Sequence, residues 1–137
     1  MRVLDCAILV LSAVEGIQAH TETIWHALEA LDIPVVLFVN KLDRMGADSN
    51  AVIAEMRDRF SPDVVLLNQP VNEGDTEAGV ETLGPEMIQE LAEQVATKND
   101  GLLERYLNDE TLVLTDLEPT IRTATSCREL FPVLCGI

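Results

Sequence analysis

"CAILVLSAVEGIQAHTETIWHALEALDIPVVLFVN", residues 6–40, holds two continuous apolar runs on either side of an amphipathic segment. The runs at 6–13 and 34–40 show no polar alternation, which is typical of parallel strands covered on both faces. Residues 18–31 between them place apolar side chains at helical spacing, and the helix ends before Pro34 because the residue preceding a proline disfavours helical backbone. This stretch therefore predicts one strand–helix–strand unit with a right-handed crossover.

The helix predicted at 18–31 is expected to bury one apolar face that includes Ile24, Leu28 and Leu31. Trp25 lies on the same segment. We expect it to pack inside the protein, because a stacking platform for nucleic-acid bases does not suit a formal net charge of −15.

Downstream of residue 40, the chain continues to alternate helical and strand patterns. The expected elements are, in chain order, a helix with its N-cap at Ser49, a short edge strand in 63–71, a loop or an excursion from the main fold over 72–84, a helix that begins at Pro85, a short helix in 99–107, a helix opened by a capping box at 115–118 and a buried strand at 131–136. We therefore predict an α/β fold with three parallel strands flanked by helices. One domain over residues 1–137 would contain a small, variable insertion at 62–110.

The composition argues against several classes of protein. Because 47% of the 137 residues are hydrophobic, the chain can bury a core and is not expected to be disordered. A formal net charge of −15 repels phosphate backbones and anionic lipids, so neither direct nucleic-acid binding nor a membrane partner is expected. Such an acidic surface suits a basic protein partner, or serves only to keep the domain soluble.

The three cysteines, Cys6, Cys127 and Cys135, are widely spaced and form no Cys-x-x-Cys pair. We expect buried free thiols in a reducing cytosol. The sequence contains no signal-peptide pattern and no apolar run of membrane-spanning length, so a soluble, cytoplasmic protein is expected. His20 and His26 are six residues apart on one predicted helix and face different sides, so no metal site is predicted, and no catalytic residue is identified.

The run "LFVNKLDRMG", residues 37–46, ends the second predicted strand in polar side chains. Ligands bind beyond the carboxyl ends of strands in open parallel sheets, and Asn40, Lys41 and Asp43 stand at such an end. The Asp43 carboxylate can accept hydrogen bonds from the ring N1–H and the amino group of guanine, whereas adenine has no donor at N1. Asn40 can donate to ring acceptors, and the aliphatic part of Lys41 can lie along a base. The alternative is a strand end that is simply solvated; the strand–helix–strand context favours the guanine site.

The segment "VLDCAILVLSAVEGIQAHTETIWHALEALDIPVVLFVNKLDRMG", residues 3–46, resembles the second half of the GTP-binding domain of translational GTPases, and the terminal "FPVLCG" follows in the family's order. It is similar to elongation factor G and more so to the tetracycline-resistance ribosomal protection proteins, which share its short insertion. The resemblance implies a P-loop NTPase (Ras-like) fold, GTP and GDP as ligands with Mg²⁺ in the complete protein, and GTP hydrolysis on the ribosome. It also implies that Asn40, Lys41 and Asp43 determine specificity for guanine.

The same resemblance identifies what this sequence does not contain. No G-x-x-x-x-G-K-[ST] loop occurs in it, although that loop holds the phosphates and its Ser or Thr holds the magnesium ion. The family's Asp-x-x-Gly segment and following His would precede residue 1, and Ile137 stands where the family continues with Ser-Ala. We therefore expect an incomplete G domain that binds guanine nucleotide weakly, with a Kd of about 1 mM, and does not hydrolyse GTP.

Two further hypotheses follow from the sequence. If no strand precedes residues 6–13, that run forms an apolar sheet edge, and the chain is expected to self-associate across it. The alternative is that the chain acts as a standalone, non-catalytic interaction module with a degenerate G-domain fold. This alternative stays open because Met1 can be a natural start. An elongation factor and a drug-resistance protein are not distinguished by these residues.

Overall fold

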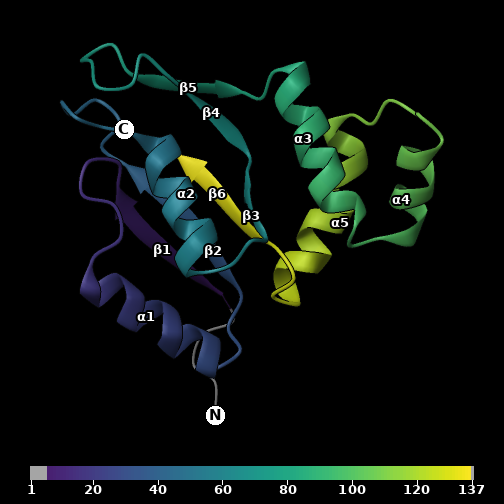
Figure 1. Ribbon diagram of the computed structural model, residues 1–137, viewed down its shortest axis with the longest axis horizontal. Helices are drawn as coiled ribbons and strands as arrows, with labels where there is room; N and C mark the ends of the chain where they lie inside the picture. The colour runs from purple at the N-terminus through teal and green to yellow at the C-terminus, as the bar shows by residue number, and fades with distance from the viewer. Residues whose placement is uncertain (1–5, 137) are drawn as a thin grey trace.

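Four parallel strands form the central sheet of the computed structural model, which describes residues 6–136 (Figure 1). Their spatial order is β1 (Ala7–Ser12), β2 (Val35–Asn40), β6 (Phe131–Cys135) and β3 (Val64–Leu66). Every neighbouring pair is parallel. The α/β class and the three expected strands are confirmed, and the predicted edge-strand segment contributes β3 as a fourth.

The described residues also form five helices: α1 (Ala19–Ala30), α2 (Ser49–Arg59), α3 (Pro85–Ala96), α4 (Asp100–Leu107) and α5 (Leu114–Ser126). Helices α1 and α2 lie in front of the sheet in Figure 1, whereas α3, α4 and α5 form a separate group beside β3 and β6. The predicted strand–helix–strand unit is therefore present as β1, α1 and β2. None of the described helices combines the length and apolar character needed to cross a membrane.

The segment 63–71, expected to be one short strand, forms two strands in two different sheets. The Leu67 N–H donates to the Val133 carbonyl at 2.9 Å, and the chain then leaves the main sheet as β4 (Asn68–Val71). Strand β4 pairs antiparallel with β5 (Gly79–Thr82), so of the two alternatives for 72–84 the excursion from the main fold is confirmed, and a loop is wrong for residues 79–82. This β4–β5 hairpin lies across the end of the sheet at which β6 finishes (Figure 1).

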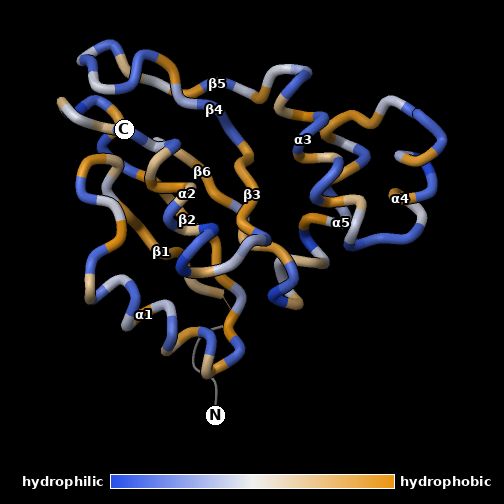
Figure 2. The backbone as a smooth tube through the Cα atoms, viewed as in Figure 1, coloured by the Kyte–Doolittle hydropathy of each residue, from blue (hydrophilic) through white to orange (hydrophobic). Residues whose placement is uncertain are grey.

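Trp25 lies in the core between α1 and the sheet and is only 1% exposed. Its ring stacks on Phe60 at 4.5 Å between centroids and meets the edge of Phe131 at 4.9 Å. The packing role predicted for Trp25 is confirmed, and Figure 2 shows the apolar residues concentrated along the central strands. The predicted helix face is partly wrong, because Ile24 is 44% exposed and Leu31 is 63% exposed. Burying the largest side chain rotates the helix away from those two residues.

Two of the predicted helix starts are displaced, that of α2 by one residue and that of α5 by two. Asp48, not Ser49, caps α2, because its carboxylate accepts the Ala51 N–H at 3.1 Å. Helix α5 begins at Leu114, before the predicted capping box, and the Asp116 carboxylate accepts the Val113 N–H at 3.0 Å. Aspartate provides the oxygen in both cases, and it competes well with serine and threonine at helix starts.

The expectation of three buried thiols is wrong for two of them. Cys6 and Cys127 are exposed, and only Cys135 is buried; all three are free. Cys6 stands just before an exposed edge strand and Cys127 follows the last residue of α5, where neither side chain is covered. Burial, together with the negative charge of Glu73, raises the pKa of the Cys135 thiol to about 11. Cys135 is therefore a packed strand residue and not a thiolate nucleophile.

One face of the sheet is open on the side of β1 and β2. Within residues 6–136, β2 is the only strand that pairs with β1. Apart from Ser12, whose carbonyl accepts the Gly16 N–H at 2.9 Å, the other edge of β1 has free backbone groups. Ile8 is 69% exposed, Val10 is 56% exposed and Leu134 is 37% exposed. The register pairs Val10 with Phe38 and Phe38 with Leu134, so these side chains share one face.

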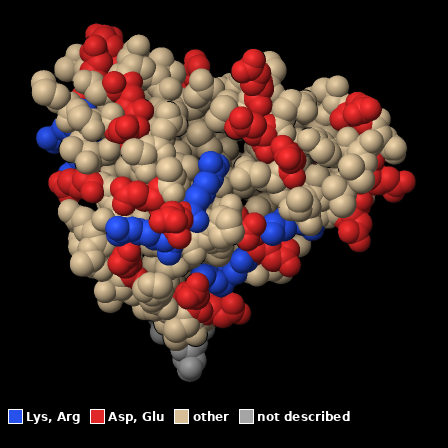
Figure 3. All heavy atoms as spheres, in the orientation of Figure 1, with Lys and Arg blue, Asp and Glu red and all other residues tan. Residues whose placement is uncertain are grey.

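Acidic side chains dominate the surface, as the formal net charge of −15 requires. On the face drawn in Figure 3 they are spread over several elements, and the basic side chains form a smaller group between them. Some of these charges pair, as Arg59 does with Glu22 at 3.0 Å and Lys98 with Asp63 at 3.0 Å.

Candidate functional site

The three predicted site residues lie together at the carboxyl end of β2. Asn40 is the last residue of the strand, and Lys41 and Asp43 follow it in a turn. Ser12, the last residue of β1, is the register partner of Asn40, and the Ala13 N–H donates to the Asn40 carbonyl at 2.9 Å. In open parallel sheets, ligands bind at this carboxyl end of the strands.

The turn after Asn40 has a specific backbone conformation. Lys41 adopts a φ of +62°, which is uncommon for a residue with a side chain and points to a constrained position. Its N–H donates to the Asn40 side-chain oxygen at 2.8 Å, and the Arg44 N–H donates to its carbonyl at 3.2 Å. The Asn40 side-chain oxygen is thus bonded within the turn, and this hydrogen bond fixes the direction in which the chain leaves the strand.

Leu42 anchors this turn in the core. It is fully buried, while Lys41 is exposed and Asp43 is half-buried. The alternation places an apolar anchor between the two charged residues and leaves both of them accessible to a ligand. A single polar run in the sequence therefore combines a packing residue with two surface residues.

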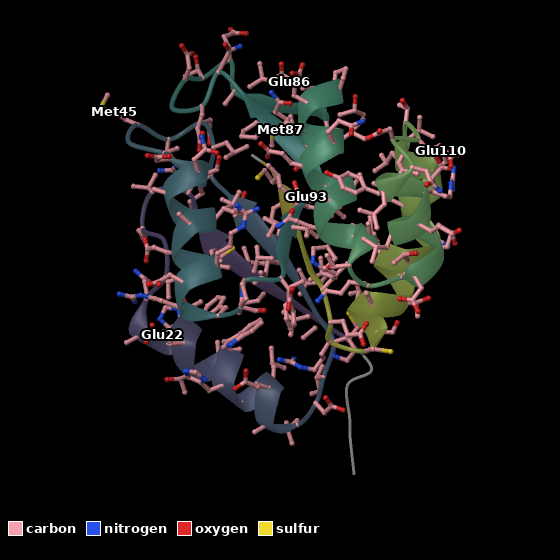
Figure 4. All side chains as sticks on the ribbon, turned by 45° about the vertical axis from the view of Figure 1, so that its right-hand side comes forward. Glu22, Met45, Glu86, Met87, Glu93 and Glu110 are labelled. Atoms are coloured by element: carbon pink, nitrogen blue, oxygen red, sulfur yellow. The ribbon has the colours of Figure 1, made fainter. Side chains whose placement is uncertain are left out.

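The 41–48 loop, defined as the residues between β2 and α2, is tied to β1 at its far end. The Asp48 N–H donates to the Ala13 carbonyl at 2.9 Å, and Gly46 takes a φ of +87° that favours glycine. Met45 is 91% exposed and projects from the tip of the loop (Figure 4). Both ends of the loop are fixed by backbone hydrogen bonds, and its tip is free.

Two hollows lie next to this loop. One, of about 180 Å³, is lined by the ends of β1 and β2 and includes Asn40 and Lys41. The other, of about 320 Å³, includes Lys41, Arg44 and Met45. Asp43 lines neither hollow, so the three residues share one loop and only two of them share a cavity.

Three further residues contact this region and were not identified from the sequence. The Glu73 carboxylate, at the tip of the β4–β5 hairpin, accepts hydrogen bonds from the N–H and the hydroxyl of Ser49. The Gly74 N–H donates to the Leu42 carbonyl at 2.7 Å. The Asn68 side chain donates to the Cys135 carbonyl at 3.0 Å and accepts the Cys135 N–H at 2.7 Å. The Glu73 contact spans 24 residues of sequence and the Asn68 contact spans 67, so no local pattern predicts them.

The site combines an amide, an ammonium group and a carboxylate at the end of one strand. Among residues 6–136, no group of three or more His, Cys, Asp and Glu side chains is placed to hold a metal ion.

Comparison with known proteins identifies the relatives of this architecture. The family profile described as "Elongation factor Tu GTP binding domain" matches residues 1–136. Elongation factor G 2 of Syntrophus aciditrophicus (strain SB) is 31% identical over 165 positions, which cover 99% of this chain and 24% of the relative. A crystal structure of a Thermus thermophilus protein superposes with a TM-score of 0.77 at 27% identity, covering 96% of this chain and 24% of that one.

This chain therefore spans about a quarter of the length of each of these two relatives. The alignment with the elongation factor extends over 165 positions, more than the 137 residues of this chain. The relative thus carries additional residues inside the matched region.

Proposed function

This chain belongs to the elongation factor Tu GTP-binding domain family, and we propose that it is the guanine-base-binding part of a translational GTPase of the elongation factor G or ribosomal protection type. The complete protein would bind and hydrolyse GTP on the ribosome, in the cytoplasm. One observation supports this most strongly. The Asn-Lys-Leu-Asp run follows a buried parallel strand, with Leu42 buried and its charged neighbours Lys41 and Asp43 accessible.

Each of the three residues has a distinct role in this proposal. The Asp43 carboxylate accepts the N1–H and the amino group of guanine, two donors that lie side by side on the base. The aliphatic part of Lys41 covers a face of the base, while its ammonium group remains hydrated. Asn40 acts as a positioning residue, because its side-chain oxygen already accepts the Lys41 N–H.

The isolated chain is expected to bind the base weakly. Most of the affinity of P-loop proteins comes from phosphates held by a glycine-rich loop, and no such loop occurs in these 137 residues. We expect a Kd of about 1 mM for guanosine monophosphate, or about 4 kcal/mol, and no hydrolysis of GTP by this chain alone.

A titration of the labelled chain followed by NMR tests this proposal. Guanosine monophosphate should shift the amide signals of the 41–48 loop at millimolar concentration, and adenosine monophosphate should leave them unchanged, because adenine lacks the N1–H donor. Equal shifts with both nucleotides would indicate binding through ribose or phosphate and would contradict the role of Asp43. Turnover of GTP by the pure chain would contradict the expected inactivity.

We also propose that the isolated chain self-associates through the free edge of β1. A second copy of the chain is the occupant, because a two-fold axis would pair β1 with its own copy as antiparallel strands. The pairing would also cover Ile8 and Val10, which are now 69% and 56% exposed. The adjoining Leu134 extends the same apolar face.

Sedimentation at about 50 µM, in the concentration range where modest interfaces associate, should show a dimer or a larger species. Val10→Lys should restore the monomer, because an edge lysine would place its charge in the interface. Leu107→Lys, at a 69% exposed position on α4 and on the far side of the sheet from β1, is the matched control and should not change the mass. A monomeric wild-type chain would overturn the proposed interface.

A further inference from the structure

We infer that the β4–β5 hairpin fixes the conformation of the 41–48 loop and thereby sets its affinity for guanine, with Glu73 as the main positioning residue. The second half of this inference rests on the proposed base-binding role of the loop. The hairpin reaches the loop from a segment 24 residues further along the chain. It makes contact at two points, and a third contact fixes the base of the hairpin itself.

The first contact holds the middle of the loop. The Gly74 N–H donates to the Leu42 carbonyl at 2.7 Å. Leu42 stands between Lys41 and Asp43 and is the fully buried residue of the turn. Its side chain is held by the core and its carbonyl by the hairpin, so the peptide that joins it to Asp43 has a defined orientation.

The second contact holds the end of the loop. The Glu73 carboxylate accepts both the N–H and the hydroxyl of Ser49, the first residue of α2, and Ser49 is fully buried. A carboxylate is favoured there because the first N–H groups of a helix have no partner within the helix and carry partial positive charge. Removing it would leave two buried donors without an acceptor.

The third contact gives the hairpin a fixed base. Asn68, the first residue of β4, exchanges two hydrogen bonds with Cys135 in β6, at 3.0 and 2.7 Å. In this way a side-chain amide continues the pairing that β3 makes with β6. Strand β6 is itself the neighbour of β2, and the Gly136 N–H donates to the Val39 carbonyl at 2.8 Å. The tip of the hairpin is therefore placed relative to the strand from which the 41–48 loop emerges.

These contacts matter because most of the other residues of the loop are solvent-exposed. Lys41, Arg44, Met45 and Asp48 are all exposed. Apart from the bonds within its own turns and the Asp48 cap of α2, the loop is held by the buried Leu42, the partly buried Ala47, the hairpin and the Asp48 N–H bond to the Ala13 carbonyl. Loss of the Glu73 contact should therefore loosen the loop while the sheet remains folded.

Glu73→Ala in the full 137-residue chain tests the inference, with Glu77→Ala as the matched control. Glu77 lies on the same hairpin turn, is exposed, and loses the same charge. We expect Glu73→Ala to raise the hydrogen-exchange rates of the Ser49 and loop amides about ten-fold, and the Kd for guanosine monophosphate at least about three-fold. Exchange in β1, β2 and β6 should stay at the wild-type rate, and Glu77→Ala should match the wild type in both measurements.

Glu73→Gln provides a second, conservative variant in case the alanine chain folds poorly. The glutamine side chain retains one oxygen that can accept from Ser49, so it should restore part of both losses. Unchanged loop exchange in Glu73→Ala would overturn the inference, and so would faster exchange with an unchanged Kd, because the contact would then be structural only. If the wild-type chain shows no guanosine monophosphate binding, the proposed function fails separately. The exchange measurement then decides alone whether the hairpin holds the loop.

Discussion

Trp25→Ala is expected to lower the free energy of unfolding by about 3–5 kcal/mol, a large share of the total stability of a domain of this size. The side chain is 1% exposed and joins α1 to the end of α2 through Phe60 and to the sheet through Phe131. The Arg128 guanidinium lies 5.4 Å from the same ring and adds a cation–π contact. Truncation to alanine would remove all three contacts and leave a cavity between helix and sheet. Urea denaturation followed by circular dichroism measures the loss.

Two control variants distinguish packing from other causes. Trp25→Phe should cost less, about 1–2 kcal/mol, since the indole N–H has no hydrogen-bond partner among residues 6–136 and an aromatic ring remains against Phe60. Ile24→Ala changes the neighbouring residue, which is 44% exposed, and should stay within about 0.5 kcal/mol of the wild type. If Trp25→Ala lowered the free energy of unfolding no more than Ile24→Ala does, the aromatic cluster would not be the main contact that holds α1 in the core.

The position of Trp25 also illustrates what the sequence could predict. Two continuous apolar runs and one helical period were enough to identify β1, α1 and β2, because these patterns are local and strong. The side of α1 that faces the core was harder, since Ile24 and Leu31 fit the helical spacing as well as Trp25 does. The choice depended on the aromatic partners Phe60 and Phe131, which come from distant parts of the sequence.

The second sheet was not predicted for a similar reason. Residues 63–71 have one continuous strand pattern, and nothing local indicates that the chain changes sheets at Leu67. The change is set by two long-range partners, Val133 for the Leu67 N–H and Cys135 for the Asn68 side chain. Pairings between residues so far apart in sequence follow from the tertiary fold and not from periodicity.

The candidate site, too, could be predicted only in part from local sequence patterns. The location of Asn40, Lys41 and Asp43 at the end of β2 follows from the sequence, because a polar run after a buried strand has only one place in a parallel sheet. The contribution of Glu73 does not, because an acidic glycine-bearing segment is typical of a solvated loop. The Glu73 carboxylate accepts a hydrogen bond from the buried Ser49, 24 residues away in sequence, and this contact can be identified only from the folded structure.

Asp43→Asn is expected to have the largest effect on ligand binding. Guanine presents two adjacent donors, the N1–H and the amino group, and the carboxylate accepts both. An asparagine keeps one oxygen acceptor, but its amide N–H would meet the guanine amino group, donor against donor. Hydrogen bonds to a charged group contribute about 1.5–3 kcal/mol, so the loss corresponds to a Kd for guanosine monophosphate at least about ten-fold higher.

The same substitution should create a preference for a different base. Xanthine carries an oxygen where guanine carries the amino group, and the asparagine amide can donate to that oxygen while accepting the N1–H. NMR titration of the variant should therefore show loop shifts with xanthosine monophosphate at millimolar concentration and none with guanosine monophosphate. Asp58→Asn, an identical change at an exposed position on α2, should keep the wild-type preference. Retained guanosine monophosphate binding in Asp43→Asn would remove Asp43 as the base-reading carboxylate. A loss of both ligands with intact loop signals would instead show that the carboxylate charge, and not its pairing pattern, holds the base.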